Sequence, residues 1–356
     1  MIDYLVIGGG IAGLSAGARL SAHGSVTVLE AEDALGYHAS GRSAAMFEPS
    51  YGPASVVALN KASPAFLTSN GGYLTPRGLM LIGGRDQRRL FEANAADLNM
   101  ESINLEDAFA RVPILNPETV GFAAINEGAF DIDTDRLLQD FARIIRANGS
   151  EVRTKMRVTG ICKATSWEVQ AGQVFKAAHV VNAAGAWVDE VAAMAGIAPI
   201  GITPRRRSMA RLPAPGGHDV RHWPMMLGAG DRWYAKPDAG KLLVSPSEAD
   251  PVQPQDAYAD DMVLAEGLVR YEEMVTEPVT RVETNWAGLR SFAPDGTLVL
   301  GRDPSDPTFV WSAGQGGYGF QTAPAASQLV ADLTVGAVPE LEPALVDALK
   351  PDRLER

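Results

Sequence analysis

The stretch Gly8-Gly9-Gly10-Ile11-Ala12-Gly13 decides the fold of this chain. It follows a short apolar run, Tyr4-Leu5-Val6-Ile7, which is typical of a buried parallel strand. The pattern from Ile11 to Ser21 predicts a helix, which His23-Gly24 ends, and Val26–Leu29 predicts a second strand. The first thirty residues therefore predict a strand–turn–helix–strand unit of the βαβ kind.

Three of these glycines, Gly8, Gly10 and Gly13, fit the spacing G-x-G-x-x-G between a strand and a helix. The first permits a tight turn, the second lets the backbone approach a pyrophosphate, and the third lets helix and strand pack closely. The free N–H groups at the helix start suit phosphate oxygens. Glu30 lies where an acid accepts hydrogen bonds from a ribose. The expected contacts with a dinucleotide come from Gly8, Gly10, Ile11, Ala12, Gly13, Glu30 and Ala31.

FAD and NAD both bind to this unit, and two later stretches favour FAD. Residues 36–45 are small, polar and punctuated by glycine, so they suit the lining of an extended cofactor beyond its pyrophosphate. The turn Gly314–Gly319 precedes a predicted helix over Ala325–Leu333 and can bring its N-terminus toward a flavin ring, where negative charge develops on reduction. A single NAD site would not need both stretches.

Three strand–glycine–helix units lie at the start, middle and end of the chain. The middle one has a strand near Val180-Val181, and a clear amphipathic helix over Asp133–Asn148 precedes it, with Asp133 as the expected N-cap. We therefore expect an α/β chain with a Rossmann-type FAD-binding lobe, a parallel sheet with flanking helices. We also expect a substrate lobe on a mixed or antiparallel sheet. The first lobe is assigned to residues 1–46, 133–200 and 286–356, and the second to residues 47–132 and 201–285.

Composition and charge narrow the class of function. The net charge is −12, so the surface repels nucleic acid and anionic membrane, and we expect neither as a partner. The one cysteine, Cys162, excludes an intrachain disulfide, and its apolar surroundings predict a buried, inert thiol. The five histidines lack the spacing of a zinc site, so no metal is expected. With no apolar run near the roughly 20 residues of a membrane span and no basic leader, the cytoplasm is the expected location.

Several stretches together resemble the D-amino-acid oxidase superfamily of FAD-dependent oxidoreductases. Within that superfamily the chain looks most like the D-arginine dehydrogenases. The likeness runs nearly end to end. Besides the N-terminal glycines, it is carried by Gly41-Arg42-Ser43, Val181–Gly185, Trp286–Arg290, Pro294-Asp295-Gly296 and Gly316–Gly319, and its most specific stretches are Tyr37–Tyr51, Asp131–Leu137, Pro204–Ser208, Tyr234–Gly240 and Trp286–Thr322.

The resemblance implies non-covalent FAD and an active site between the two lobes. It implies hydride transfer from the α-carbon of a free D-amino acid to flavin N5, giving an imino acid that hydrolyses to a 2-oxo acid and ammonia. Gly317 and Gln321 would approach the amino group or the flavin edge, and Val158 would lie by the adenine. The further cofactor contacts that it implies are Gly41, Arg42, Ser43, Ala44, Ala45, Val158, Ala184, Gly185, Trp187, Arg290, Gly314, Gly316, Gly317, Tyr318, Gly319, Gln321 and Thr322.

By the same resemblance, Arg207 and Arg290 bind the substrate carboxylate, with Tyr51 and Tyr234 nearby. Arginine offers a carboxylate a planar, bidentate fork. Strand alternation places Arg206 on the opposite face from Arg207, which points Arg207 inward. Simpler explanations stay open: a solvated charge run for Arg207, a structural ion pair for Arg290, and ordinary core packing for the two tyrosines.

Two departures from the D-arginine dehydrogenases bear on the substrate pocket. Where they carry a carboxylate for the distal guanidinium, this chain has Leu79, and where they carry a histidine beside the substrate, it has Met46. Burying a guanidinium against leucine would cost several kcal/mol, so we expect a preference for an apolar or neutral side chain. Glu48 lies in the same loop and could reach a basic side chain from another direction. The loss of the histidine also leaves no obvious general base.

Other activities remain compatible with these residues. His38 stands in an H-A-x-G setting like that of some amine dehydrogenases with covalent FAD, although non-covalent binding is favoured. The alternatives are a glycine or sarcosine type of amine oxidase, a 2-hydroxy-acid or polyol dehydrogenase, and a flavin-carrying subunit whose partner holds the catalytic site. The electron acceptor, whether a quinone, another carrier or oxygen, does not follow from the sequence.

Overall fold

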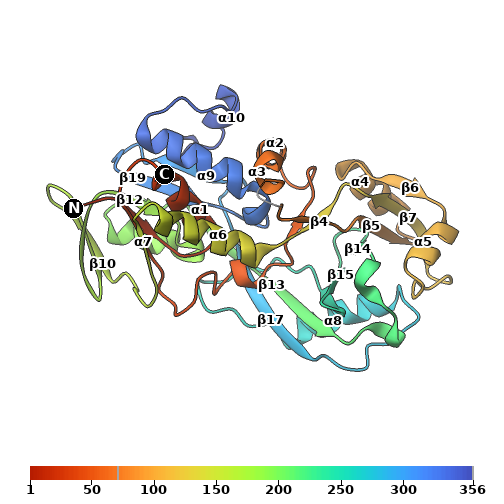
Figure 1. The fold of residues 1–356 in the computed structure, drawn as a ribbon. Coiled ribbons are helices and arrows are strands. Elements are labelled where there is room, and N and C mark those ends of the chain that lie inside the picture. The colour runs from red at the N-terminus through yellow and green to blue at the C-terminus, as the bar shows by residue number, and fades with distance from the viewer. Residues whose placement is uncertain (70–71, 355–356) are drawn as a thin grey trace.

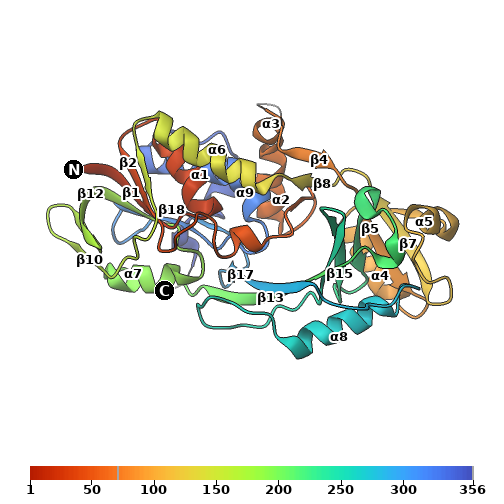
Figure 2. The same cartoon turned by 60° about the horizontal axis from the view of Figure 1, so that its bottom comes forward.

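Two large sheets lie at opposite ends of an elongated molecule in the computed structural model, which describes residues 1–69 and 72–354 (Figure 1). The first sheet carries the N-terminal glycine turn, and the second is built mainly from the later half of the chain. The long strands β13 (Thr203–Leu212) and β17 (Thr284–Phe292) pair with each other and reach from the second sheet toward the first (Figure 2). The predicted α/β fold class is confirmed.

The first sheet has a parallel centre. Strand β1 pairs in parallel with β2 and β12, and β12 pairs in parallel with β19, while the hairpins at the edges are antiparallel. Its strand order is β10-β11-β12-β1-β2-β9, with β19 beside β12 and β18 beside β19. The strands are β1 Ile2–Ile7, β2 Val26–Leu29, β9 Glu151–Arg153, β10 Gly160–Lys163, β11 Trp167–Ala171, β12 Gln173–Asn182, β18 Val299–Arg302 and β19 Phe309–Ala313.

Three helices cover one face of this sheet, with α1 (Ile11–Leu20) in contact with both α6 (Thr134–Ala147) and α9 (Gly319–Val335) (Figure 1). The predicted N-cap of α6 is confirmed, because the Asp133 side chain accepts a hydrogen bond from the backbone N–H of Arg136. The apolar stripe of α6 is buried against α1. Shorter helices in this part are α7 Val188–Met194, α10 Pro343–Asp347, η1 Ser40–Arg42, η2 Gly185–Trp187 and η5 Pro351–Arg353.

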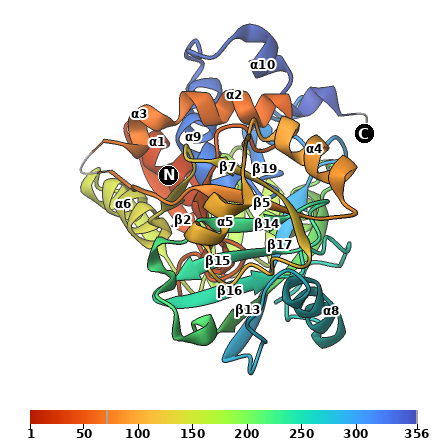
Figure 3. The same ribbon diagram turned by 90° about the vertical axis from the view of Figure 1, so that its right-hand side faces the viewer.

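The second sheet is antiparallel except where β14 pairs in parallel with β5. Its order is β17-β13-β16-β15-β14-β5-β7-β6, and α8 packs against β13 and β16 (Figure 3). Besides β13 and β17, its strands and helices are β5 Leu79–Gly84, β6 Glu101–Ile103, β7 Val120–Asn126, β14 Met225–Gly228, β15 Tyr234–Asp238, β16 Lys241–Ser245, α4 Arg88–Asp97, α5 Leu105–Arg111, α8 Asp261–Glu272, η3 Pro215–Gly217 and η4 Val220–His222.

A small third sheet, ordered β3-β8-β4, joins the two parts. Its elements and the helices beside it are β3 Met46–Phe47, β4 Leu74–Pro76, β8 Phe130–Ile132, α2 Ala54–Ala62 and α3 Pro64–Leu67. The division into two lobes stays a prediction, and two segments near its boundaries pack as follows. Val56, Leu59 and Leu67 pack in the core of the first sheet, because α2 lies against α9. The boundary at residue 286 falls within β17, which belongs to the second sheet.

The prediction for Cys162 is wrong, because this side chain is exposed. It lies in the edge hairpin β10–β11, where alternate side chains face away from the core. No helix within residues 1–69 and 72–354 combines the length and apolar character needed to cross a lipid bilayer. Over the same residues, no three His, Cys, Asp or Glu side chains gather as a metal ion would require.

Candidate functional site

The glycine turn between β1 and α1 has the form that the sequence predicts. Gly8 has a φ of +114°, a conformation that side chains rarely tolerate. A Cβ atom at Gly13 would overlap the carbonyl oxygen of Gly8, so α1 can pass this close to the turn only with glycine there. Gly10 is the N-cap of α1, and the backbone N–H of Ile11 donates to Ser40 Oγ at 3.0 Å.

Two adjoining cavities meet at this turn. We call them the large cavity, of about 580 Å³, and the small cavity, of about 340 Å³. They share the lining residues Gly10, Ala39, Ser40, Arg42, Ala183, Gly185, Gly288 and Leu289. Together they form a channel outside the carboxyl ends of β1 and β12, which is where ligands bind in open α/β sheets.

The small cavity collects several residues predicted to contact the cofactor, including Glu30 for a ribose and Val158 for the adenine. Its lining includes Gly8, Glu30, Ala31, Val158, Ala184 and Trp187. The buried Glu30 accepts hydrogen bonds from the backbone N–H of Gly9 at 2.7 Å and of Glu32 at 2.9 Å. Each of its oxygens keeps a second lone pair, so the carboxylate can still accept a ribose hydroxyl. His38 also lines this cavity and not the large one.

The large cavity contains both predicted substrate arginines and both tyrosines, Tyr51 and Tyr234. The Arg207 guanidinium lies 5.9 Å from the centre of the Tyr234 ring. Burial, and then the positive charge of Arg290, lower the pKa of Arg207. Within the described residues neither guanidinium forms an ion pair, whereas Arg206 faces away and lies 3.4 Å from Asp260. Two cations that form no direct ion pair among the described residues therefore face one cavity, and an anionic ligand suits them.

Strand alternation accounts for this placement. Arg207 and Arg290 lie on the paired strands β13 and β17, where Arg205 stands opposite Arg290 and Arg207 stands opposite Gly288. Gly288 has no side chain, so β17 is open to the cavity at the position opposite Arg207. Gly317 leaves space for the Arg290 guanidinium, since a Cβ there would lie 3.2 Å from Arg290 Cζ. Tyr51 is 38% exposed and is therefore not an ordinary core residue, while Tyr234 is buried beside Met209.

An apolar wall completes the large cavity on the side of the second sheet. Leu79 on β5 stands beside Met225 on the neighbouring strand β14, and both belong to one apolar cluster with Met46. The side chains of this wall are Met46, Leu79, Leu98, Met209, Met225 and Leu227. The last four were missed from the sequence, because they come together only through the shared sheet of β5, β14 and β13 and the end of α4, where Leu98 lies.

Glu48 is the buried acid of the large cavity, with 4% of its surface exposed. Asn126 Nδ2 donates to its Oε1 at 3.0 Å, and its Oε2 has no hydrogen-bond partner. Burial raises the pKa of Glu48, outweighing the opposite effects of the Ser50 N–H, the Asn126 amide and the Tyr51 N–H. Its backbone N–H donates to Gln321 Oε1 at 3.2 Å, which fixes the loop against α9.

The turn before α9 and the first residues of this helix border the large cavity through Gly314, Gly316, Gly317, Gly319 and Gln321, and their contact with a flavin stays a prediction. Four predicted cofactor contacts line neither cavity: Gly13, Gly41, Tyr318 and Thr322. Gly13 lets α1 pass close to Gly8, as described above. The N–H of Gly41 donates to the carbonyl oxygen of Gly36 at 2.6 Å and so closes a turn. The Thr322 hydroxyl donates to the carbonyl oxygen of Tyr318 at 2.9 Å, within the first turn of α9.

Comparison with known proteins identifies the class. Residues 3–333 match the DAO family, described as FAD dependent oxidoreductase, and the chain belongs to this family. It is 25% identical to a glycine oxidase of Pseudomonas putida, over 96% of this chain and 97% of that protein.

Two solved structures show the same fold. A glycine oxidase from Geobacillus kaustophilus gives a TM-score of 0.84 at 19% identity, covering 100% of this chain and 99% of that one. An L-proline dehydrogenase from P. horikoshii gives 0.82 at 23% identity, covering 99% and 97%. The predicted superfamily and the predicted cofactor, FAD, are confirmed. The finer likeness to D-arginine dehydrogenases stays a prediction, since these relatives are named for glycine and L-proline.

The residues present fit FAD. A side chain at Gly8 or Gly13 would overlap a backbone carbonyl oxygen, so glycine lets the turn and α1 pack closely, and Gly10, the N-cap of α1, lines both cavities. The small cavity offers an acid for a ribose, and the large cavity has the start of α9. This order matches a cofactor that runs from an adenosine end, through a pyrophosphate, to a flavin ring.

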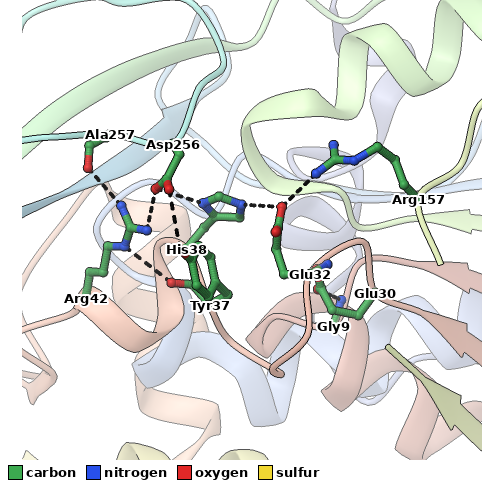
Figure 4. A network of polar contacts seen from close by, with 9 residues as sticks. All are labelled: Gly9, Glu30, Glu32, Tyr37, His38, Arg42, Arg157, Asp256 and Ala257. Carbon is green, nitrogen blue, oxygen red and sulfur yellow. Dashed lines mark hydrogen bonds and ion pairs between the residues drawn. The ribbon is translucent and has the colours of Figure 1, made fainter. Parts of the chain in front are cut away.

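A polar network missed from the sequence borders the small cavity (Figure 4). Asp256 lies between β16 and α8, and its carboxylate accepts from Arg42 Nη2 at 2.5 Å, which lowers the pKa of Asp256. His38 stands between this acid and Glu32, with Nε2 at 3.2 Å from Glu32 Oε1 and Nδ1 at 3.8 Å from Asp256 Oδ1. Arg42 Nη1 also donates to the carbonyl oxygen of Ala257 at 2.9 Å. The segment around Asp256 and Ala257 is thus bound by hydrogen bonds to Arg42, in the loop that borders the channel.

Replacing Asp256 by asparagine is expected to speed FAD release about fivefold, because it removes a charge-assisted hydrogen bond from a partly exposed pair. The measurement is the rise of FAD fluorescence after dilution of the purified protein. Asp250→Asn is the matched control, because Asp250 is exposed and lies 3.7 Å from Arg206, outside both cavities. Equal release rates for the two variants would show that the Asp256 contact does not retain FAD.

Proposed function

We propose that this protein oxidises the carbon–nitrogen bond of a free amino acid, favouring a D-enantiomer with an apolar or neutral side chain. The observation that carries the proposal is the pair of arginines, Arg207 and Arg290, which face an apolar wall across one cavity and form no direct ion pair among the described residues. Bound FAD supplies a hydride acceptor at flavin N5, so that the substrate becomes an imino acid, which water hydrolyses to a 2-oxo acid and ammonia.

Each group of residues has a separate task in this proposal. The guanidinium forks of Arg207 and Arg290 hold the carboxylate and so fix where the α-carbon lies. Tyr51 and Tyr234 flank that clamp, and Gln321 and Gly317 border the place of the amino group. The residues proposed to hold FAD are Gly8, Gly10, Ile11, Ala12, Glu30, Ala31, Arg42, Ser43, Ala44, Ala45, Val158, Ala184, Gly185, Trp187, Gly314, Gly316 and Gly319. His38 lies in the small cavity between two acids and does not line the large cavity, where the flavin ring is proposed to bind. Non-covalent FAD is therefore favoured.

The side-chain preference can be measured directly. Leu79 and Met46 offer no partner to a guanidinium, and burying that charge against them costs several kcal/mol. We expect leucine or methionine to be oxidised with a kcat/KM about 100-fold above that of arginine, in an assay of 2-oxo acid formation with an added dye as electron acceptor. Near-equal values for leucine and arginine would contradict the proposed preference.

A glycine or secondary-amine oxidase is the second candidate, favoured by the relative from Pseudomonas putida. Such substrates would leave the apolar wall of six side chains without contact, which is why larger side chains are preferred here. Adding glycine and sarcosine to the same assay separates the two functions. Admitting air to the reduced protein tests whether oxygen is the electron acceptor, and adding a quinone without air tests that carrier.

A further inference from the structure

A buried carboxyl group without a counter-ion stands in the large cavity. Glu48 Oε1 is held by the Asn126 amide, and Oε2 has no hydrogen-bond partner. Within residues 1–69 and 72–354, Glu48 forms no ion pair, and no charged side chain is among the groups that shift its pKa. The donors that lower the pKa of this carboxyl group are neutral, namely the Ser50 N–H, the Asn126 amide and the Tyr51 N–H, so a positively charged group would stabilise the buried carboxylate further. The bound substrate is one source of such a group.

A zwitterionic substrate needs partners of both charges. The arginines supply the positive partners for its carboxylate. Three acids among the described residues line the large cavity, namely Glu48, Asp97 and Asp231. Asp97 and Asp231 are exposed, whereas Glu48 is buried. Glu48 is therefore the acid best shielded from water, where a charge pair is strongest.

The loop places Glu48 beside the clamp. Its backbone N–H donates to Gln321 Oε1, and Gln321 Nε2 donates to the carbonyl oxygen of Tyr51 at 3.4 Å. The backbone N–H of Tyr51 donates in turn to the carbonyl oxygen of Glu48 at 3.1 Å. Glu48, Gln321 and Tyr51 therefore form one rigid unit that also borders Arg290 in the cavity.

We propose that Glu48 is the counter-ion and proton acceptor of the substrate's α-ammonium group. The proposal rests on the proposed function and adds an acid that selects amino acids over hydroxy acids. In the step, one N–H bond of the ammonium breaks and its proton forms an O–H bond with Glu48 Oε2. The nitrogen keeps the electron pair, Glu48 becomes neutral, and the substrate becomes an amine with its carboxylate still on the arginines. A hydroxyl group brings no positive charge, so a 2-hydroxy acid gains no such pair.

The test compares two ligands that cannot be oxidised. α-Methylleucine has no hydrogen on its α-carbon, and the matching carboxylic acid lacks only the amino group. Their binding to the FAD-loaded protein is followed by the change in flavin absorbance. We expect Glu48→Gln to weaken α-methylleucine binding about 30-fold and to leave the deaminated acid within about twofold. Glu48→Asp, which keeps the charge, should recover part of the lost affinity.

The matched control is Glu127→Gln, because Glu127 follows Asn126 but is exposed and pairs with Arg111 at 2.7 Å, outside the cavity. Retained FAD shows that each variant is folded. Equal effects of Glu48→Gln on both ligands, or no effect on either, would overturn the assignment. If leucine reduces the wild-type flavin while Glu48→Gln changes nothing, this inference alone fails. If no amino acid binds to or reduces the wild-type protein, the proposed function fails too.

Discussion

Replacing Arg290 by leucine is expected to lower kcat/KM for the amino-acid substrate by about 1,000-fold. The guanidinium faces the large cavity opposite Gly317 and forms no ion pair among the described residues, so the ligand carboxylate is its proposed partner. Removing one member of a desolvated, bidentate charge pair costs roughly 2–5 kcal/mol, and about 4 kcal/mol corresponds to this factor. The measurement is the rate of flavin reduction against substrate concentration in anaerobic mixing.

Arg205→Leu is the matched control for this prediction. Arg205 stands opposite Arg290 in the strand pair, but it does not line the large cavity, and its Nη1 donates to the carbonyl oxygen of Ala249 at 3.1 Å. We expect its kcat/KM to stay within about threefold of the wild-type value, since a partly exposed charge away from the cavity contributes little. A decrease in kcat/KM of less than tenfold for Arg290→Leu would show that Arg290 does not bind the substrate carboxylate as proposed.

Replacing Gly13 by valine is expected to yield protein without FAD. The new Cβ would overlap the carbonyl oxygen of Gly8, so α1 or the turn must move and the cradle for the pyrophosphate is lost. We expect FAD affinity to fall by at least about 100-fold, measured as the flavin absorbance that remains bound after purification. Circular dichroism reports whether the helices persist.

Gly160→Ala serves as the control for the glycine turn. Gly160 lies in the same sheet, on β10, and a Cβ there would meet its nearest neighbour, Gln170 Cγ, at an ordinary 3.7 Å. Full FAD content is expected for this variant. If Gly13→Val also retained FAD at the wild-type level, close passage of α1 by the turn would not be needed for cofactor binding.

Local chemistry is what the sequence predicts well in this chain. The unit around Gly8–Gly13 could be predicted because its turn, helix start and strands depend on neighbouring residues. Helix α6 could be predicted because Asp133 caps it and its apolar stripe has helical spacing. Alternation along β13 predicts that Arg207 and Arg206 face opposite sides of the strand. Each of these inferences needs only a few consecutive residues.

Contacts between distant segments could not be predicted in this way. Asp256 meets Arg42 across 214 positions of sequence, and nothing near Asp256 indicates that contact. The apolar wall forms because β5 pairs with β14 in the second sheet. Cys162 is exposed because it lies in a hairpin at the edge of the first sheet. Helix α9 starts at Gly319, before the predicted Ala325–Leu333, and includes Pro324, which weakens the local helical signal.

The most direct test of the central claim is anaerobic mixing of the FAD-loaded protein with D-leucine, L-leucine and the 2-hydroxy acid that has the same side chain. The absorbance of oxidised flavin is followed in each case. We predict that D-leucine bleaches the flavin and that the amount of 2-oxo acid and ammonia equals the amount of flavin reduced. Bleaching by the hydroxy acid alone, or by none of the three ligands, would contradict oxidation of an amino-acid carbon–nitrogen bond at this site.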